Sequence, residues 1–345
     1  MGILDFFRNP NAPDPRMQRQ GYSSSGVGLV DRFRRAERFW HPHLARNRKC
    51  IETFATRLLG SDETPRGALL VFGSGRLLDV PWRTLFPRFE RVVLFDADAD
   101  SKPQVERMLQ ESRVPNMPKP EFVIGDLTDS VVEVAHAAEQ IVNGAGSAAL
   151  AERALIEGFS RVQPPRPAWS ARYPDARLAL STNLLSQLGY FPRFHVQKVF
   201  KARFQQAFEN QAHAVEALEC YFNRVRAQHV RALAELRAAY LSADVAVRSY
   251  MLDVAGGPKV FEAPLPEDAG AALDNFGEVK LAWPARIKPG LPPLHTQKLG
   301  DLWPETSDAR RLDSWAWHIV PQGSEKNYEE SGRVHVVEAW GQARV

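Results

Sequence analysis

The sequence predicts an α/β protein with a doubly wound, mostly parallel sheet, preceded by N-terminal helices and closed by an antiparallel hairpin. Between residues 67 and 126, short apolar segments alternate with helical ones, as expected for parallel strands joined by crossover helices. The closing segments 314–321 and 333–340 alternate apolar and polar residues around a polar turn, which is typical of a hairpin. We therefore expect a Rossmann-like sheet with a reversed C-terminal edge.

The individual elements follow from local patterns. GALLVFGSG is wholly apolar up to its glycine turn, which indicates a strand buried on both faces. The helix expected at 78–89 has Asp79 as its N-cap and Pro81 in its first turn. The predicted strands are 67–75, 91–98, 121–126, 244–254, 314–321 and 333–340, and a fourth strand within 176–188 that breaks at Ser181–Asn183 into a turn or short helix. The other predicted helices lie within 31–59, with a break near Pro42, and within 104–112, 130–162 and 196–241.

Two parts are expected along the chain. Residues 1–60 would form an N-terminal arm with one or two helices, and residues 61–345 would form the α/β domain. Within that domain, residues 255–312 are rich in proline and glycine and show little periodicity, so we expect an irregular insertion there.

Composition excludes several classes of protein. Of the 345 residues, 44% are apolar and 25% charged, which is ordinary for a globular chain. There is no apolar window of 18 residues and no secretory pattern at the start, so we expect no membrane contact and a cytoplasmic location. Cys50 and Cys220 lack the spacing of a disulfide framework or zinc site, which indicates reduced thiols and no metal.

Charge is unevenly distributed, although the net charge is only +3. Residues 1–50 hold ten Lys or Arg against four acids. A basic helix can contact phosphates, but no aromatic-rich sheet motif accompanies it, so a solvated helix face is the favoured interpretation. Nucleic acid is therefore not expected as a partner, and nothing in the sequence indicates an oligomeric state.

Three features stand at the carboxyl ends of the first three predicted strands, where open α/β sheets bind ligands. Gly73-Ser74-Gly75 lets the backbone approach a ligand closely. Asp96, 21 residues beyond Gly75, can accept both hydroxyls of a ribose. Gly125-Asp126-Leu127 places an acid beside a backbone N–H, an arrangement that can bind an adenine edge. Together they predict a nucleoside site.

A dinucleotide is the competing ligand for this site. The dinucleotide fingerprint needs a third small residue, where this chain has Leu78, and a helix that opens inside the motif. Pro81 would then fall inside that helix and break it. A longer loop removes the conflict and leaves no tight pyrophosphate cradle, which favours an adenosyl cofactor over NAD.

The segments LLVFGSGRLLDVP, LFDAD and VIGDL resemble motifs one to three of class I S-adenosylmethionine-dependent methyltransferases, and most closely an uncharacterised bacterial branch with GSGxLxDVP and a later NLLSQL. The resemblance covers residues 68–254. It implies S-adenosylmethionine as cofactor, with the following residues at its site: Gly73, Ser74 and Gly75 for the methionine part, Asp96 with Ala97 for the ribose, Asp126 with Leu127 for the adenine, and Asn183 for the substrate or the methionine amine.

The chain also departs from that family. Val71 and Phe72 stand where the first motif usually has an acid, and a third glycine is missing. No Asn/Asp-Pro-Pro-Tyr follows the fourth strand, so amino-directed nucleic-acid methylases are not indicated.

The leading hypothesis is a methyltransferase for a small molecule or a protein, with its substrate enclosed by the N-terminal helices and the 255–312 insertion. A catalytically silent scaffold or partner protein of the same fold is the alternative, and an NAD(P)-dependent oxidoreductase is the third. The activated sulfonium requires little covalent chemistry from the protein, so no catalytic residue is predicted. His229 and His318 are interpreted as structural.

Overall fold

The computed structural model describes residues 14–22, 25–60, 64–167, 169–254, 279–280, 285–289, 298–322, 324–325 and 331–344. The strands are β1 (Ala68–Phe72), β2 (Arg91–Asp96), β3 (Glu121–Ile124), β4 (Ala176–Thr182), β5 (Ala238–Val254), β6 (Val279–Lys280), β7 (Ala285–Pro289), β8 (Arg310–Val320) and β9 (Gly332–Ala343).

The α-helices are α1 (Pro15–Arg19), α2 (Ser25–Leu59), α3 (Trp82–Leu85), α4 (Ser101–Ser112), α5 (Val131–Gly144), α6 (Ala148–Arg161), α7 (Trp169–Arg172), α8 (Tyr190–Phe204) and α9 (Ala212–Glu235). Short 3-10 helices are η3 (Phe86–Arg88), η4 (Phe208–Asn210) and η5 (Leu299–Leu302). Among the described residues, every helix is too short or too polar to cross a bilayer.

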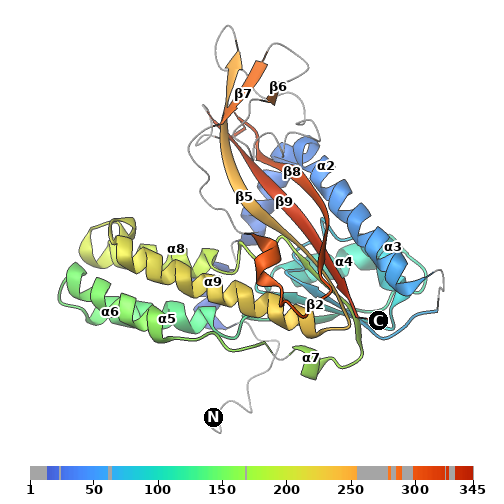
Figure 1. Ribbon diagram of the computed structural model, residues 1–345, viewed down its shortest axis with the longest axis horizontal. Helices are drawn as coiled ribbons and strands as arrows, with labels where there is room; N and C mark the ends of the chain where they lie inside the picture. The colour runs from blue at the N-terminus through green and yellow to red at the C-terminus, as the bar shows by residue number, and fades with distance from the viewer. Residues whose placement is uncertain are drawn as a thin grey trace.

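The strands form one mixed sheet in which β3, β2, β1, β4 and β5 lie side by side and parallel (Figure 1). The C-terminal strand β9 pairs antiparallel with β5, and β8 pairs antiparallel with β9. The far end of β5 instead pairs with β7, which pairs with β6. This order confirms the predicted Rossmann-like, doubly wound sheet and its antiparallel C-terminal hairpin.

Both faces of the sheet are covered because successive side chains of a strand point to opposite faces. In β1, Leu70 and Phe72 belong to the core beneath α5, α6 and α9. Leu69 and Val71 belong to a second core formed with α2, α3 and α4. A strand buried on both faces explains why GALLVF has no polar residue.

The break predicted in the N-terminal helix is present but lies earlier. Two helical segments of α2 meet at a kink at Ala36 (φ −116°, ψ 17°), six residues before Pro42. Proline lacks an N–H and crowds the preceding turn, so the distortion falls N-terminal to it. Trp40 and Ile51 are buried in the same core as the strands, so α2 packs directly on the sheet.

Other boundaries also differ. The helix expected at 196–241 is two helices, because Gln205 (φ 56°) ends α8 in a left-handed conformation and β5 already begins at Ala238. The helix expected at 78–89 is reduced to α3 and η3, and Pro81 rather than Asp79 stands at its N-cap. Much of 255–297 lies outside the described residues.

Candidate functional site

The loop after β1 bends at two glycines with positive φ, Gly73 (67°) and Gly75 (47°). A Cβ on Gly73 would meet the Leu184 side chain at 3.0 Å, so both the backbone conformation and the space favour glycine. The Ser74 amide donates to the Phe95 carbonyl over 3.0 Å. The loop therefore lies across the end of β2, where the sequence predicted a nucleoside site.

Asp96 is brought directly to this loop. Its Oδ2 accepts from the Gly75 amide and from Ser74 Oγ at 3.4 Å, and its Oδ1 accepts from the Asp98 amide at 2.8 Å. The residue is 8% exposed, and burial raises the pKa of its carboxyl to about 6. A carboxylate offers about four acceptor positions, so Asp96 keeps room for one further donor.

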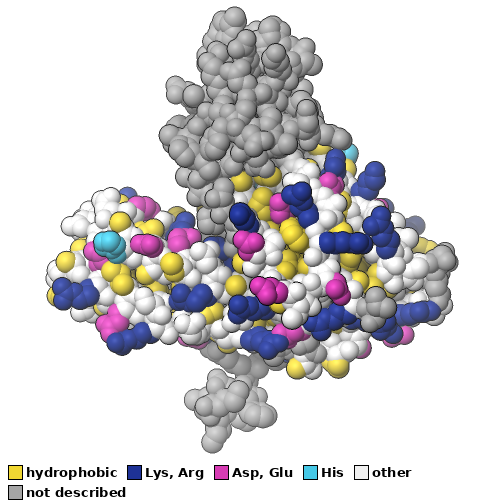
Figure 2. All heavy atoms as spheres, in the orientation of Figure 1, with side chains coloured by type: hydrophobic (Ala, Val, Ile, Leu, Met, Phe, Trp, Pro, Cys, Tyr) yellow, Lys and Arg dark blue, Asp and Glu magenta, His cyan; other side chains and the backbone are white. Residues whose placement is uncertain are grey.

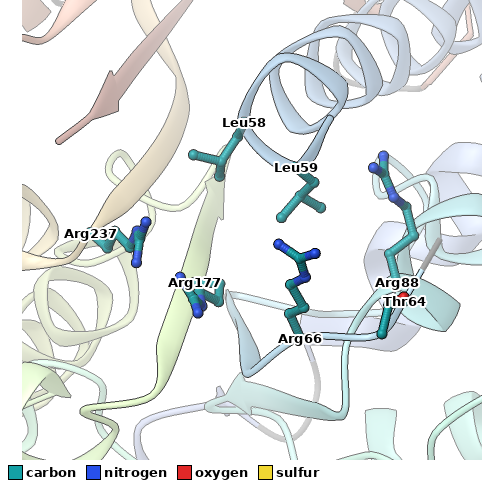
Figure 3. A pocket seen from close by; sticks show the side chains of 7 residues that line it. All are labelled: Leu58, Leu59, Thr64, Arg66, Arg88, Arg177 and Arg237. Atoms are coloured by element: carbon teal, nitrogen blue, oxygen red, sulfur yellow. The ribbon is translucent and has the colours of Figure 1, made fainter. Parts of the chain in front are cut away.

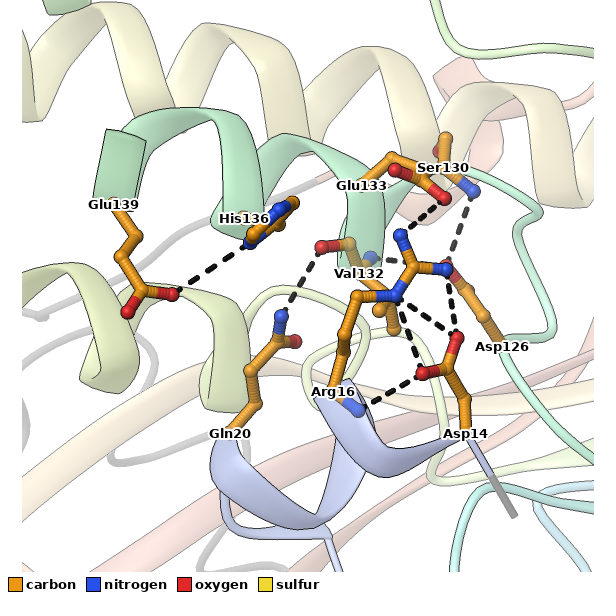
Figure 4. Close-up of polar contacts among 9 residues, drawn as sticks. All are labelled: Asp14, Arg16, Gln20, Asp126, Ser130, Val132, Glu133, His136 and Glu139. Atoms are coloured by element: carbon orange, nitrogen blue, oxygen red, sulfur yellow. Dashed lines mark hydrogen bonds and ion pairs between the residues drawn. The ribbon is translucent and has the colours of Figure 1, made fainter. Parts of the chain in front are cut away.

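The Asp126 carboxylate is fully bonded within the chain. Its Oδ1 accepts from the amide (2.9 Å) and hydroxyl (2.7 Å) of Thr128, and its Oδ2 from the amides of Ser130 (3.1 Å) and Val132 (3.0 Å). These bonds satisfy free N–H groups at the start of α5 (Figure 4). With four donors its acceptor capacity is filled, so contacts to a ligand here fall to its neighbours Gly125 and Leu127.

A cavity of about 350 Å³ adjoins this segment. Part of its lining is apolar or aromatic, from Phe95, Leu127 and Trp169, and much of the rest consists of acidic and arginine side chains. The apolar part suits a flat heterocycle. The predicted third motif therefore borders a cavity even though the Asp126 carboxylate is committed elsewhere.

The arm that carries α1 forms the other side of this cavity. Arg16 Nη1 pairs with Glu133 of α5 at 2.6 Å, and Gln20 Nε2 donates to the Val132 carbonyl at 3.1 Å (Figure 4). Met17 is buried against α5, and Ala97 packs at the margin of that cluster. The arm thus connects the loop after β2 with the start of α5.

Asn183 lies elsewhere. It follows β4 with a positive φ of 51°, and its Nδ2 lies 2.7 Å from Asp79 Oδ2 and 3.2 Å from His43 Nε2. Asp79 also accepts from Asn47 Nδ2 (3.3 Å) and Thr182 Oγ1 (3.4 Å). Burial raises the pKa of Asp79. Asn183 thus bonds to Asp79, four residues beyond Gly75, and not to Asp96.

This cluster reaches from α2 to β8, because Trp315 Nε1 donates to His43 Nδ1 over 2.9 Å. Burial lowers the pKa of His43 to about 3, so its imidazole is neutral. Sequence reasoning treated Asp79 only as a helix cap and assigned His43 no role. The sequence signal for this cluster was Asp79 itself, an acid between the glycine turn and Pro81. It lies too close to the turn to begin a helix, so its carboxylate was available for other contacts.

A second pair missed from the sequence lies where β5 passes the end of β4. Asp244 Oδ2 lies 3.2 Å from His335 Nδ1 on β9, and its Oδ1 accepts from Ser186 Oγ at 2.6 Å. Burial alone would raise the pKa of Asp244, but the contacts with His335 and Ser186 outweigh it and lower that pKa. A carboxylate beside an imidazole is an arrangement that can hold and move a proton.

The two histidines interpreted as structural are buried. His229 Nε2 lies 3.0 Å from Ser181 Oγ, and His318 packs edge-on against Phe39. Burial lowers both pKa values to about 3. Within the described ranges, no group of three or more His, Cys, Asp or Glu side chains is placed to hold a metal ion.

No family model and no curated protein matches the chain. Among solved structures, an S-adenosylmethionine-dependent methyltransferase from Clostridium acetobutylicum aligns at a TM-score of 0.29 and 9% identity, over 84% of this chain and 91% of that one. Magnesium protoporphyrin IX methyltransferase from Synechocystis with bound SAH aligns at 0.31 and 11%, over 94% and 99%. These scores and identities are too low to carry a functional assignment.

Proposed function

We propose that this chain binds S-adenosylmethionine across Gly73–Gly75 and the cavity beside Leu127, and that it is a methyltransferase for a small-molecule or protein acceptor. The observation that carries the proposal is the bond between the Gly75 amide and the Asp96 carboxylate. It joins the glycine turn and the acid of the second strand, which are the first two motifs of the resemblance. The strands that precede these two motifs, β1 and β2, are parallel neighbours in the sheet.

The geometry after β1 favours an adenosyl group over a dinucleotide. Helix α3 begins at Trp82, seven residues beyond Gly75, and it has only four residues. A pyrophosphate binds where a helix N-terminus directly follows the glycine turn, and no such terminus follows Gly75. A ligand without phosphate does not need a helix N-terminus at this place.

The residues present fit this cofactor in part. Asp96 keeps one acceptor position for a ribose hydroxyl, and the apolar part of the cavity beside Leu127 can pack against an adenine ring. S-adenosylmethionine supplies an already activated methyl group, so the protein must mainly position the acceptor. An acceptor that arrives protonated needs a base, and Asp244 with His335 is the carboxylate–imidazole pair nearest the end of β4.

Calorimetric titration with S-adenosylmethionine, S-adenosylhomocysteine and NAD tests the proposal. We expect saturable binding of both adenosyl compounds, none of NAD, and at least a tenfold loss of affinity in Asp96→Ala. Asp100→Ala is the matched control, since this exposed acid starts α4 without a side-chain cap bond. Absence of adenosyl binding at millimolar concentration would contradict the proposal, and binding of NAD alone would favour an oxidoreductase.

A cofactor-binding protein without methyl transfer is the second candidate function. It is favoured by Asp126, whose two carboxylate oxygens already accept hydrogen bonds within the chain. Incubation of cell extracts with methyl-labelled cofactor separates the two candidates. Label transfer by the wild type that Asp96→Ala abolishes supports the enzyme, whereas cofactor binding without any labelled acceptor supports the silent protein.

A further inference from the structure

Four arginines gather at the amino ends of the parallel strands, at the edge of the sheet opposite the glycine loop. Arg66 precedes β1, Arg88 precedes β2, Arg177 is the second residue of β4, and Arg237 immediately precedes β5. With Leu58 and Leu59 of α2 and with Thr64 they line a cavity of about 90 Å³, here called the arginine pocket (Figure 3). Parallel strands place all their amino ends together, which explains how residues so distant in sequence meet.

The side chains differ in how they are held. Arg88 Nη2 donates to the Gly60 carbonyl over 2.6 Å, and Arg66 has contacts of its own. Neither Arg177 nor Arg237 forms a side-chain hydrogen bond or ion pair with any residue of the described ranges. Figure 3 shows Arg177, Arg237 and Arg66 directed into the space below the last turn of α2, whereas Arg88 extends away from it.

The charge of the pocket is not balanced by its described lining, which contains no acidic residue. Asp175, which lies directly before β4, pairs instead with Arg91 at 3.3 Å. Like charges held together cost free energy unless an anion joins them. Guanidinium groups are planar forks with several donors, so a group of them binds a phosphate group through paired hydrogen bonds.

We infer that the arginine pocket is a binding site for the phosphate group of a small phosphorylated molecule. A localised cavity favours a small anion over a nucleic acid, which needs an extended basic track. On the face drawn in Figure 2, basic and acidic side chains are interspersed and form no such track.

This site is separate from the proposed cofactor site. Strands of five to seven residues separate the two edges of the sheet, a distance of roughly 15–20 Å at about 3.3 Å per residue. A molecule in the arginine pocket therefore cannot be the carboxylate or ribose of a cofactor bound over Gly73. The inference does not depend on the methyltransferase proposal.

Titration of the full chain with inorganic phosphate and pyrophosphate at constant ionic strength tests the inference. We expect saturable binding and a rise in melting temperature, both absent with chloride. The double variant Arg177→Gln/Arg237→Gln should lose at least about tenfold in affinity, equivalent to about 1.4 kcal/mol. The control Arg153→Gln/Arg231→Gln removes the same charge from exposed positions on α6 and α9 and should bind as the wild type does.

Arg177→Lys keeps the charge and the fold but loses the fork, so it should bind phosphate more weakly than the wild type. A wild-type circular dichroism spectrum and a cooperative thermal transition in every arginine variant would show that the protein is folded, whether or not it binds an adenosyl compound. Equal phosphate affinity in the wild type and the double variant, or no saturable binding at millimolar concentration, would overturn the inference. Tighter binding of a single-stranded oligonucleotide with a steep salt dependence would overturn it in favour of nucleic acid.

Discussion

The charged side chains at the two edges of the sheet differ in how many hydrogen-bond partners they have within the chain. At the carboxyl edge, Asp79, Asp96 and Asp126 each accept at least three hydrogen bonds from nearby N–H or O–H groups. At the amino edge, the side chains of Arg177 and Arg237 have no bonding partner among the described residues. Buried charge that is satisfied within the chain contributes to the fold, whereas clustered charge without a partner is available to a ligand.

This difference predicts opposite effects when charge is removed. At the carboxyl edge, deletion of a carboxylate leaves buried donors without acceptors and should destabilise the protein. At the amino edge, deletion of an arginine relieves repulsion and should leave the stability unchanged or slightly higher.

Asp79→Ala should have the largest effect, a loss of about 3 kcal/mol in the free energy of unfolding. The variant leaves the donors of Asn47, Thr182 and Asn183 without their shared acceptor. This cost exceeds the free energy gained because a carboxylate no longer has to be buried. Urea denaturation measures it. Asp79→Asn keeps one acceptor and should lose less than half as much, and equal losses in the two variants would show that the hydrogen bonds are not the cause.

Asp96→Asn should change how the free energy of unfolding depends on pH. Burial raises the pKa of Asp96 from 3.8 to about 6, so the folded protein holds this proton more tightly than the unfolded chain. Its contribution to stability is therefore highest below about pH 4 and is lost as the pH rises through about 6, an effect of about 3 kcal/mol.

The free energy of unfolding of the wild type, measured from pH 3.5 to 7.5, should fall more steeply between pH 4 and 6 than that of Asp96→Asn. The Asp100→Ala control should follow the wild type. Parallel pH curves for the wild type and Asp96→Asn would show that Asp96 titrates normally and is not buried as the structure has it.

Asp126→Ala should cost about 1.5 kcal/mol, because Ser130 and Val132 would lose the acceptor of their amides at the start of α5. Asp126→Asn retains an acceptor oxygen and should cost less. Thermal or urea unfolding measures both. A loss of cofactor affinity in Asp126→Asn without any loss of stability would instead assign the side chain to the adenine.

Much of the fold was predictable because its signals are local. An apolar run such as residues 68–72 fits only a strand buried on both faces, and the alternating segment around Trp315–Trp317 fits a hairpin with one buried face. The position of the kink in α2, at Ala36 and not at Pro42, was not predictable in this way. Packing of Trp40 and Ile51 against the sheet stabilises the helical segment that contains Pro42.

Some contacts of the candidate site were predictable from the sequence, and others were not. Gly75 and Asp96 follow neighbouring parallel strands, so their proximity follows from strand order alone. Asn183 and Asp79 meet through side chains that reach across a loop, and their partner His43 comes from a helix 140 residues earlier. No periodicity encodes such contacts, and the same holds for Asp244 with His335.

Arg16→Ala should have a small effect on stability, below about 1 kcal/mol, because its ion pairs with Asp14 and Glu133 are partly exposed. The arm nevertheless borders the cavity beside Leu127, so the affinity for S-adenosylhomocysteine should fall a few-fold. Calorimetry of the variant measures it, with Arg19→Ala, an exposed arginine of the same helix, as control. Unchanged affinity in Arg16→Ala would remove the arm from the cofactor site.

The smallest expected effect, and the sharpest contrast with Asp79→Ala, is that of Arg177→Gln/Arg237→Gln on stability without ligand. Repulsion at the amino edge is relieved, so the free energy of unfolding should stay within about 0.5 kcal/mol of the wild type, on the more stable side at low salt. Added sodium chloride should abolish the difference, since these side chains lie where salt screens them. A clear loss of stability at every salt concentration would mean that the arginines are already paired within the chain, and the contrast between the two edges would then disappear.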